Sequence, residues 1–215
     1  QRQMCIRDSR NDDYCEGTAW QWTWFVPHDV DGLVELMGGR DAFIGKLDSL
    51  FTADSKLEGE STSVDISGLI GQYAHGNEPS HHIAHLYNYV GQPWRTQEIV
   101  DEVLHTLYFN NPDGLSGNED CGQMSAWYIL NAMGFYQVCP GKPVYSIGRP
   151  LFNEATVHLK DGKSFKVIAH NNSRDNKYVR SIVLNGNKLE TPFFTHQDIV
   201  DGGTLELTMG SEPLK

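Results

Sequence analysis

The spacing of apolar residues divides the chain into a helical part and a strand-rich part. Up to about residue 140, apolar side chains recur at i, i+3 and i+4, which is the spacing of an amphipathic helix. Glycine-rich polar stretches separate these repeats, so the pattern predicts helices joined by loops. Five helices are predicted, over residues 30–38, 40–51, 78–90, 96–108 and 121–135.

Local signals support several of these helices. Pro79 stands near the start of the third helix, where the first helical turn tolerates proline. Gly134 follows the apolar repeat of the last helix and is expected to end it. The second helix has one apolar face, formed by Phe43, Leu47, Leu50 and Phe51.

After PGKP at 140–143 the apolar spacing changes to two. Runs such as ATVHLK, SFKVIAHN and TLELTMG alternate apolar with polar residues, and DGK, NNSRDN and NGNK separate such runs as turns. This alternation predicts antiparallel strands in a sheet or sandwich. Helices followed by strands indicate a mainly α fold with a β appendage. We therefore expect a helical region over 14–140 and a β-rich region over 141–215.

Residues 1–13 are set apart from this division. The first ten, QRQMCIRDSR, show no apolar run of the kind that a signal peptide contains. They also differ in character from the remainder of the chain. We expect this N-terminus to be unrelated to the rest or disordered.

Composition narrows the classes of function. The chain has 17 Lys and Arg against 28 Asp and Glu, for a net charge of −11, which disfavours binding to nucleic acid. The chain contains no run of 18 apolar residues, so no membrane span is predicted. The four cysteines match no zinc or CxxC spacing. Aromatic residues make up 11%, which suits either an aromatic core or a neutral polar ligand such as carbohydrate.

The first polar cluster is YCEGTAWQWTWFVPHD, at 14–29. Glu16 precedes three tryptophans, and an aromatic surround would desolvate its carboxylate and raise its pKa. A raised pKa is what a general acid needs at neutral pH. The alternative interpretation is an ordinary carboxylate at a turn or helix end.

The second cluster is HGNEPSHHIAHLYNY, at 75–89. Asn77 and Glu78 offer the oxygen ligands that calcium prefers, whereas histidines would suit zinc. His81 and His82 are adjacent and would point about 100° apart on a helix. Only His81 and His85 have the i, i+4 spacing of a helical zinc pair, and no HExxH motif is present. Zinc is therefore the weaker interpretation.

The third cluster is PDGLSGNEDCGQMSAW, at 112–127. Asn118, Glu119 and Asp120 stand before a predicted helix, where acidic residues often act as caps. Carboxylates in a loop bounded by Gly117 and Gly122 can also bind a cation or activate a water. A fourth stretch, VDISGLIGQYAHG at 64–76, is glycine-rich and leads into the histidine cluster, but it is weak by itself.

Together these clusters suggest two separated carboxylates, a site for a hard metal and aromatic walls. Glycoside hydrolysis requires two carboxylates across the scissile bond. The chain has no GxSxG motif for acyl transfer, and neither GxxxxGK[ST] nor GxGxxG for nucleotides. Two alternatives stay open: a non-catalytic, calcium-dependent carbohydrate-binding module, and a structural α+β protein whose clusters are caps and turns.

Three long segments carry a resemblance to a known family: EGTAWQWTWFVPHDVDGLVELMGG, GLIGQYAHGNEPSHHIAHLYNYVGQPW and DGLSGNEDCGQMSAWYILNAMGFYQVCPG. From about residue 14 to 160 the chain resembles glycoside hydrolase family 92. The resemblance implies an exo-acting α-mannosidase that is calcium-dependent and inverting and acts on mannose-containing glycans. It also implies an N-terminal β-sandwich and a C-terminal (α/α)6 barrel, with the site between them.

The resemblance assigns roles to individual residues. Glu16 of CEGTAW is similar to the catalytic acid of the family, and Asp120 of GNED is similar to the general base. Asn118 occupies a position that is often Asp and assists the base. Asn77 and Glu78, with Asp120, are implied as calcium ligands. The residues implied to contact the sugar are Trp20, His81 and His82.

The chain also departs from the family pattern. Family members are considerably longer, so we expect a C-terminal catalytic fragment containing part of the (α/α)6 toroid. The N-terminal domain of the parent protein would then be its partner. EGTAW replaces the commoner EGNAW and keeps the carboxylate. The resemblance implies a periplasmic or secreted location.

Overall fold

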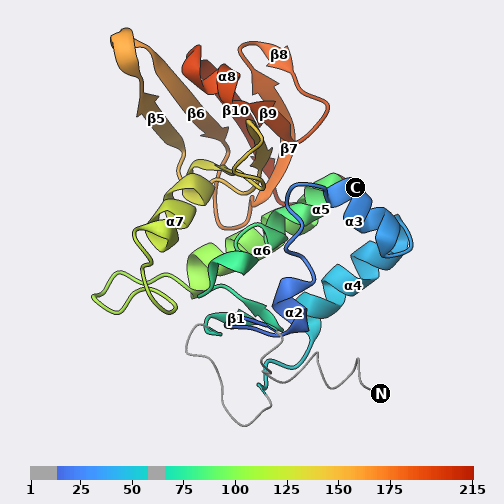
Figure 1. Cartoon of the computed structure of the whole chain (residues 1–215). Coiled ribbons are helices and arrows are strands. Elements are labelled where there is room, and N and C mark those ends of the chain that lie inside the picture. The colour runs from blue at the N-terminus through green and yellow to red at the C-terminus, as the bar shows by residue number, and fades with distance from the viewer. Residues whose placement is uncertain (1–13, 58–65) are drawn as a thin grey trace. The chain divides into compact units, whose positions relative to one another are not determined.

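The computed structural model describes residues 14–57 and 66–215, which form two compact units (Figure 1). Among these residues, the first unit contains the part up to 83 together with 106–125, and the second contains 84–105 and 126–215. Residues 1–13, expected to be unrelated or disordered, lie outside the described part. The division into regions at residue 140 stays a prediction.

The first unit is built on short helices and a small hairpin. α4 (Arg40–Thr52) buries Phe43, Leu47, Leu50 and Phe51, which confirms the predicted face. α3 (Val30–Leu36) ends two residues before the predicted limit, because Gly38 and Gly39 adopt positive φ angles. The elements are α2 (Ala19–Trp22), α3 (Val30–Leu36), α4 (Arg40–Thr52), β1 (Leu69–Ile70), β2 (Tyr73–Ala74) and η1 (Glu78–Ser80).

The continuous helix predicted over 78–90 is wrong. The chain instead forms two short 3₁₀ turns, η1 and η2 (Ile83–His85), and then α5 (Leu86–Tyr89). Residues 80–88 are all buried, including three histidines that need polar partners. The ring of His82 bonds to the backbone carbonyl of Trp24, 58 positions away, and the ring of His81 to that of His75. These tertiary contacts override the local helical spacing.

The other two predicted helices are confirmed with shifted ends. α6 (Pro93–Thr106) begins three residues early, at a proline, which suits the first helical position. α7 (Gln123–Met133) ends at Gly134, whose φ is +105°.

The predicted strands after residue 140 are confirmed, in two sheets (Figure 1). The five-stranded sheet has the order β5-β6-β10-β7-β8 and the three-stranded sheet the order β3-β4-β9. The strands are β3 (Phe135–Tyr136), β4 (Val144–Ile147), β5 (Glu154–His158), β6 (Ser164–His170), β7 (Tyr178–Leu184), β8 (Asn187–Lys188), β9 (Phe193–Thr195) and β10 (Gly203–Gly210), with η3 (Lys160–Gly162) between β5 and β6.

The expectation of purely antiparallel pairing is wrong at one place. β10 pairs in parallel with β6, with Leu205 opposite Val167. Short hairpins connect β5 to β6 and β7 to β8, whereas β10 returns to β6 only after several intervening elements, and a crossover of that length permits parallel pairing. One of these elements is α8 (His196–Val200), which the strand pattern missed and which a Thr195–Asp198 capping box starts.

The two sheets share one apolar core. Phe165 of β6 stacks on Phe194 of β9, with ring centroids 5.9 Å apart and planes 11° apart. Leu205, Leu207 and Ile147 join the same cluster with no exposed surface. The second unit therefore contains the sandwich-like packing that the alternating pattern predicts.

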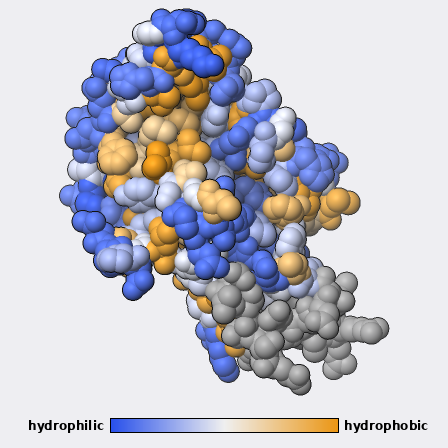
Figure 2. All heavy atoms as spheres, turned by 60° about the vertical axis from the view of Figure 1, so that its left-hand side comes forward, coloured by the Kyte–Doolittle hydropathy of each residue, from blue (hydrophilic) through white to orange (hydrophobic). Residues whose placement is uncertain are grey.

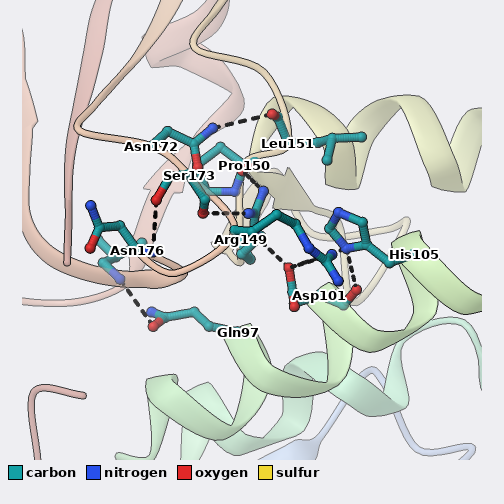
Figure 3. Close-up of polar contacts among 11 residues, drawn as sticks. Gln97, Asp101, His105, Arg149, Pro150, Leu151, Asn172, Ser173 and Asn176 are labelled. Carbon is teal, nitrogen blue, oxygen red and sulfur yellow. Dashed lines mark hydrogen bonds and ion pairs between the residues drawn. The ribbon is translucent and has the colours of Figure 1, made fainter. Parts of the chain in front are cut away.

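A buried ion pair connects α6 to the loops of the sheets (Figure 3). Arg149 has 2% of its surface exposed, and its Nε lies 2.8 Å from Oδ1 of Asp101. Its two Nη atoms donate to the backbone carbonyls of Pro150 and Ser173. Nδ1 of His105, one turn along α6, donates to the carbonyl of Asp101 at 2.7 Å. Arg149 thus holds three segments of the second unit together.

The helices of the described residues are all too short or too polar to cross a membrane. Figure 2 shows one face of the molecule, on which apolar and polar side chains are interspersed.

Candidate active site

The segment 75–82 of the first unit connects the loops that carry the candidate catalytic residues. Nδ2 of Asn77 donates a hydrogen bond of 3.0 Å to the backbone carbonyl of Glu16. The indole of Trp22 donates to the neighbouring carbonyl of Cys15 at 2.8 Å. The loop that carries Glu16 is therefore held through its backbone from two sides.

The side chain of Glu16 is exposed, so the desolvation expected from the tryptophans is not found. Of the three tryptophans, Trp22 bonds to the backbone carbonyl of Cys15 in the same loop. Trp24 is 1% exposed and packs edge-on against Phe43. The role of Glu16 as an acid stays a prediction.

The loop before α7 carries both a helix cap, Glu119, and the candidate base, Asp120. Glu119 accepts hydrogen bonds from the backbone N–H and the hydroxyl of Ser125, at 2.9 and 2.8 Å. Glu119 thus fulfils the capping role that was considered for this acidic cluster. Asn118 and Asp120 are exposed. Their predicted roles in activating a water stay predictions.

Both candidate carboxylates stand on backbone in the left-handed region. φ is +50° at Glu16, +50° at Asp120 and +56° at Cys121. The other non-glycine residues with positive φ in the described part are Asp161, Asn171 and Asn185, residue types that often adopt it in turns. Asp120 is of the same residue types, whereas positive φ is uncommon for Glu16 and Cys121. Strained backbone clusters at functional sites, so its presence in both loops supports a functional hypothesis.

His81 joins the central segment to the start of α7. Its Nε2 donates to the carbonyl of His75 at 2.9 Å, which leaves Nδ1 to accept from Nε2 of Gln123 at 3.0 Å. The ring is therefore neutral, with its proton on Nε2. His81 is 2% exposed, and this burial lowers its pKa to about 4. Gln123 is three residues beyond Asp120, so the bond helps to place the loop of the candidate base.

His75 forms a second connection to α7. The hydroxyl of Tyr108 donates to the carbonyl of Met124 and so accepts from Nε2 of His75, at 2.7 Å. Nδ1 of His75 then accepts from the hydroxyl of Tyr73 at 2.8 Å. Burial lowers the pKa of His75 well below its usual value, with a further contribution from His81.

His82 is buried and connects the segment 75–82 to the end of the tryptophan stretch. It is 4% exposed, and its Nε2 donates to the carbonyl of Trp24 at 2.7 Å. Burial lowers its pKa. Contact of His81 and His82 with a sugar stays a prediction, and the described geometry shows them supporting loops.

Both ring nitrogens of His81 and of His85, the two histidines with the spacing of a helical zinc pair, are used within the protein. His81 bonds as described, and His85 bonds to Asn131 at 2.8 Å and to Ser146 at 3.0 Å. Across residues 14–57 and 66–215, no group of three or more His, Cys, Asp or Glu side chains is placed to hold a metal ion. Zinc binding by His81 and His85 is therefore not supported by the described residues.

The oxygen donors fit a calcium site only in part. Asn77 and Glu78 are adjacent, buried and half-buried respectively, and both are hard ligands. Calcium takes six to eight oxygens, so these two would be a minority of its ligands. Nδ2 of Asn77 faces Glu16, which leaves its amide oxygen as the donor. The participation of Asp120 stays a prediction.

Trp20 borders a hollow between α2 and α4. It is half-buried on α2 and, with residues of α4, lines a hollow of about 320 Å³. The other lining residues are Ala19, Thr23, Gly45, Lys46 and Ser49. Neither His81 nor His82 lines this hollow. Contact of Trp20 with a sugar stays a prediction.

Sequence reasoning missed His75, Tyr108 and Gln123. No spacing connects Gln123 with His81, 42 positions earlier, and Tyr108 reads as the end of an apolar helix repeat. His75 was visible in the HGNE stretch, but its partners were not.

Comparison with known proteins decides the family. The model of the glycosyl hydrolase family 92 catalytic domain matches residues 2–211. The chain belongs to glycosyl hydrolase family 92. This confirms the resemblance drawn from the three long segments, and the match includes N-terminal residues that composition had set apart.

Two solved mannosidases and one fungal glycosidase match nearly the whole chain. The α-mannosidase BT3965 of Bacteroides thetaiotaomicron is 43% identical, with a TM-score of 0.84 over 94% of this chain and 26% of that protein. The inverting mannosidase BT2199 of the same species is also 43% identical, with a TM-score of 0.79 over 93% of this chain and 28% of that protein. An uncharacterized secreted glycosidase of Arthroderma benhamiae is 31% identical over 97% of this chain and 25% of its own length. The chain thus spans about a quarter of the length of these relatives.

Proposed function

We propose that the chain contributes the catalytic carboxylates of an exo-acting α-mannosidase that hydrolyses mannose from glycans with inversion. One observation carries the proposal: the loops of Glu16 and Asp120 are both attached to the segment 75–82. Asn77 bonds to the backbone of the Glu16 loop. His81 bonds to Gln123, which follows the Asp120 loop by three residues. Family membership and the solved relatives named mannosidases support the substrate class.

In this proposal Glu16 protonates the leaving oxygen and Asp120 activates the attacking water. Asn118, two residues before Asp120, assists the base. An inverting site keeps its carboxyl groups roughly 6.5–9.5 Å apart, which leaves room for the water. Both side chains are exposed on loops that other residues hold in place. Each carboxylate can therefore reach a sugar bound in the same site.

We also propose that Asn77 and Glu78 supply two of the oxygen ligands of a calcium ion, with Asp120 as a third. When bound, calcium supplies positive charge that engages adjacent mannose hydroxyls. The helices of the chain would then form part of an (α/α)6 toroid. A periplasmic or secreted location agrees with the description of the fungal relative as secreted.

The test is mannose release by the full-length protein from an α-mannobioside with calcium, followed by proton NMR of the first product. β-Mannose is expected, and α-mannose would mean a retaining route. Glu16→Gln and Asp120→Asn should both lose activity, whereas Asp113→Asn, an exposed carboxylate near the second loop, should keep it. Mannose binding without any release would favour a carbohydrate-binding module instead.

A further inference from the structure

Three backbone segments of the first unit touch one another at glycines. A methyl group on Gly76 would lie 2.0 Å from the hydroxyl of Ser67 and 2.8 Å from the carbonyl oxygen of Ser116. A methyl group on Gly117 would lie 3.0 Å from the same hydroxyl and 3.2 Å from the carbonyl oxygen of Gly76. We call these four residues, Ser67, Gly76, Ser116 and Gly117, the glycine junction.

Backbone hydrogen bonds hold one side of the junction in register. The N–H of Gly76 donates to the carbonyl of Ser67 at 3.0 Å, and the N–H of His75 donates to the carbonyl of Gly68 at 3.1 Å. The segment 66–68 therefore runs beside 75–76, and both meet residues 116–117. The hydroxyl of Ser67 is buried without a hydrogen-bond partner among the described residues, so at this contact it acts as a spacer.

Position 76 favours glycine because neighbouring atoms lie close to it, and not because of its backbone angles. Gly76 is not among the glycines with positive φ, so any residue could adopt its backbone angles. The neighbouring atoms exclude a side chain, and one of them is a backbone oxygen that cannot rotate away.

The junction lies next to both candidate loops. Gly76 directly precedes Asn77, whose side chain holds the backbone of Glu16. Gly117 directly precedes Asn118 and stands three residues before Asp120. The distance between the segment that holds the acid and the loop that carries the base is therefore set where Gly76 meets Ser116 and Gly117.

We infer that the glycine junction is a positioning element that fixes the Asp120 loop against the segment 75–78. The inference rests on the proposed function, and it gives the glycine-rich stretch 64–76 a role. The junction residues touch no reacting atom; they act through Asn77 and Asp120.

The principal experiment compares Gly76→Ala with the wild type in the full-length protein. Because a misplacement of about 1 Å can cost roughly 100-fold in rate, we expect kcat for aryl α-mannosides to fall by about that factor while KM changes little. The loss should be the same for good and poor leaving groups, because the base is displaced. Gly141→Ala is the matched control, since Gly141 has no neighbouring atom within 4 Å and no positive φ.

A second-site change separates positioning from general damage. Ser67→Gly in the Gly76→Ala background removes the 2.0 Å contact and leaves the one with Ser116, so part of kcat should return. If Gly76→Ala does not fold, Ser67→Thr takes its place, because it adds a methyl group to the same contact from the other side. Wild-type kcat in a folded Gly76→Ala, or the absence of any recovery in the double variant, would overturn the inference.

Hydrogen exchange keeps the two proposals distinguishable. Amides of residues 116–122 should exchange faster in Gly76→Ala than in the wild type, while those of α4 stay unchanged. If the wild-type protein releases no mannose, the proposed function fails, yet faster exchange would still show that the junction holds this loop. If the wild-type protein is fully active and exchange in Gly76→Ala is unchanged, the role of the glycine junction is wrong and the proposed function stands.

Discussion

Asn77 and Glu16, 61 positions apart, are joined by one hydrogen bond from the Asn77 amide to the Glu16 backbone carbonyl, at 3.0 Å. Because the bond ends on the backbone, the carboxylate of Glu16 stays exposed. The φ angle of +50° at Glu16 is therefore stabilised from outside its own loop.

We expect Asn77→Asp to loosen the Glu16 loop, because a carboxylate oxygen would face the carbonyl in place of the N–H donor. Loss of one partly buried hydrogen bond should lower the free energy of unfolding by roughly 1 kcal/mol, with more from the unpaired charge. Amides 15–18 should exchange faster. Asn110→Asp is the control, since Asn110 is exposed. Equal exchange in the two variants would show that the bond does not hold the loop.

The buried histidines predict how stability depends on pH. The pKa of His81 is about 4 in the folded protein and about 6.5 when unfolded, chiefly because burial disfavours its charged form. Between these values the unfolded state binds more protons, so stability is full above pH 6.5 and falls as the pH decreases toward 4. The pKa values of His75 and His82 are lowered in the same direction and add to the effect.

We expect His81→Gln to flatten this dependence. Its amide can still donate to the carbonyl of His75, but it does not titrate between pH 4 and 6.5. The slope of unfolding free energy against pH should decrease by up to about 1.4 kcal/mol per pH unit, measured by urea unfolding at several pH values. His28→Gln, at an exposed position, should leave the slope unchanged. A slope unaffected by His81→Gln would exclude the residue as the source.

The fold followed from sequence where contacts are local. The apolar face of α4 repeats within one helix, and Gly134 ends α7 through its own backbone angle. The helix over 78–90 failed because His81 and His82 bond to carbonyls that only the folded chain brings near. The parallel pairing of β10 with β6 likewise depends on how the chain returns, which alternation does not encode.

The candidate site was likewise predictable from local signals but not from long-range contacts. Residue types and turn signals were sufficient to select Glu16, Asp120 and the HGNE stretch as chemistry-bearing. They did not reveal that Gln123 supports His81, or that Tyr108 supports His75, because those pairs are 42 and 33 positions apart. The exposed state of Glu16 was also missed, since nearness in sequence does not show that Trp24 packs against Phe43 of α4.

The buried ion pair of the second unit should be essential to its stability. In Arg149→Met, the carboxylate of Asp101 loses its 2.8 Å partner, and two backbone carbonyls lose their donors. Removing one member of a buried pair costs about 3–5 kcal/mol, and we expect a loss of that order in urea unfolding. Arg174→Met is the control, because Arg174 is 65% exposed and 4.0 Å from the same carboxylate. Similar losses in both variants would contradict a special role for Arg149.

Calcium binding should depend on Glu78. We expect calorimetry on the full-length protein to detect calcium at millimolar concentration or tighter, in the range of roughly 10⁻³ M and below that oxygen sites span. Glu78→Ala should abolish the signal, whereas Glu35→Ala, an exposed carboxylate on α3, should retain it. Identical binding in the wild type and Glu78→Ala would remove Glu78 from the ligands. Preferential binding of zinc would revive the histidine interpretation.

The two carboxylates should differ in how their loss depends on the leaving group. Glu16 is proposed to protonate the departing oxygen, so Glu16→Gln in the full-length protein should slow poor leaving groups most and activated aryl mannosides least. Asp120 is proposed to activate water, so Asp120→Asn should slow both kinds of substrate alike. General acid or base catalysis contributes roughly 10²–10⁴-fold, which sets the expected loss in kcat. The measurement is kcat/KM across aryl α-mannosides of graded leaving-group pKa, with Asp113→Asn as the matched control. A leaving-group dependence that steepens in Asp120→Asn and not in Glu16→Gln would reverse the two assignments, and equal slopes in both variants would leave neither carboxylate as the acid.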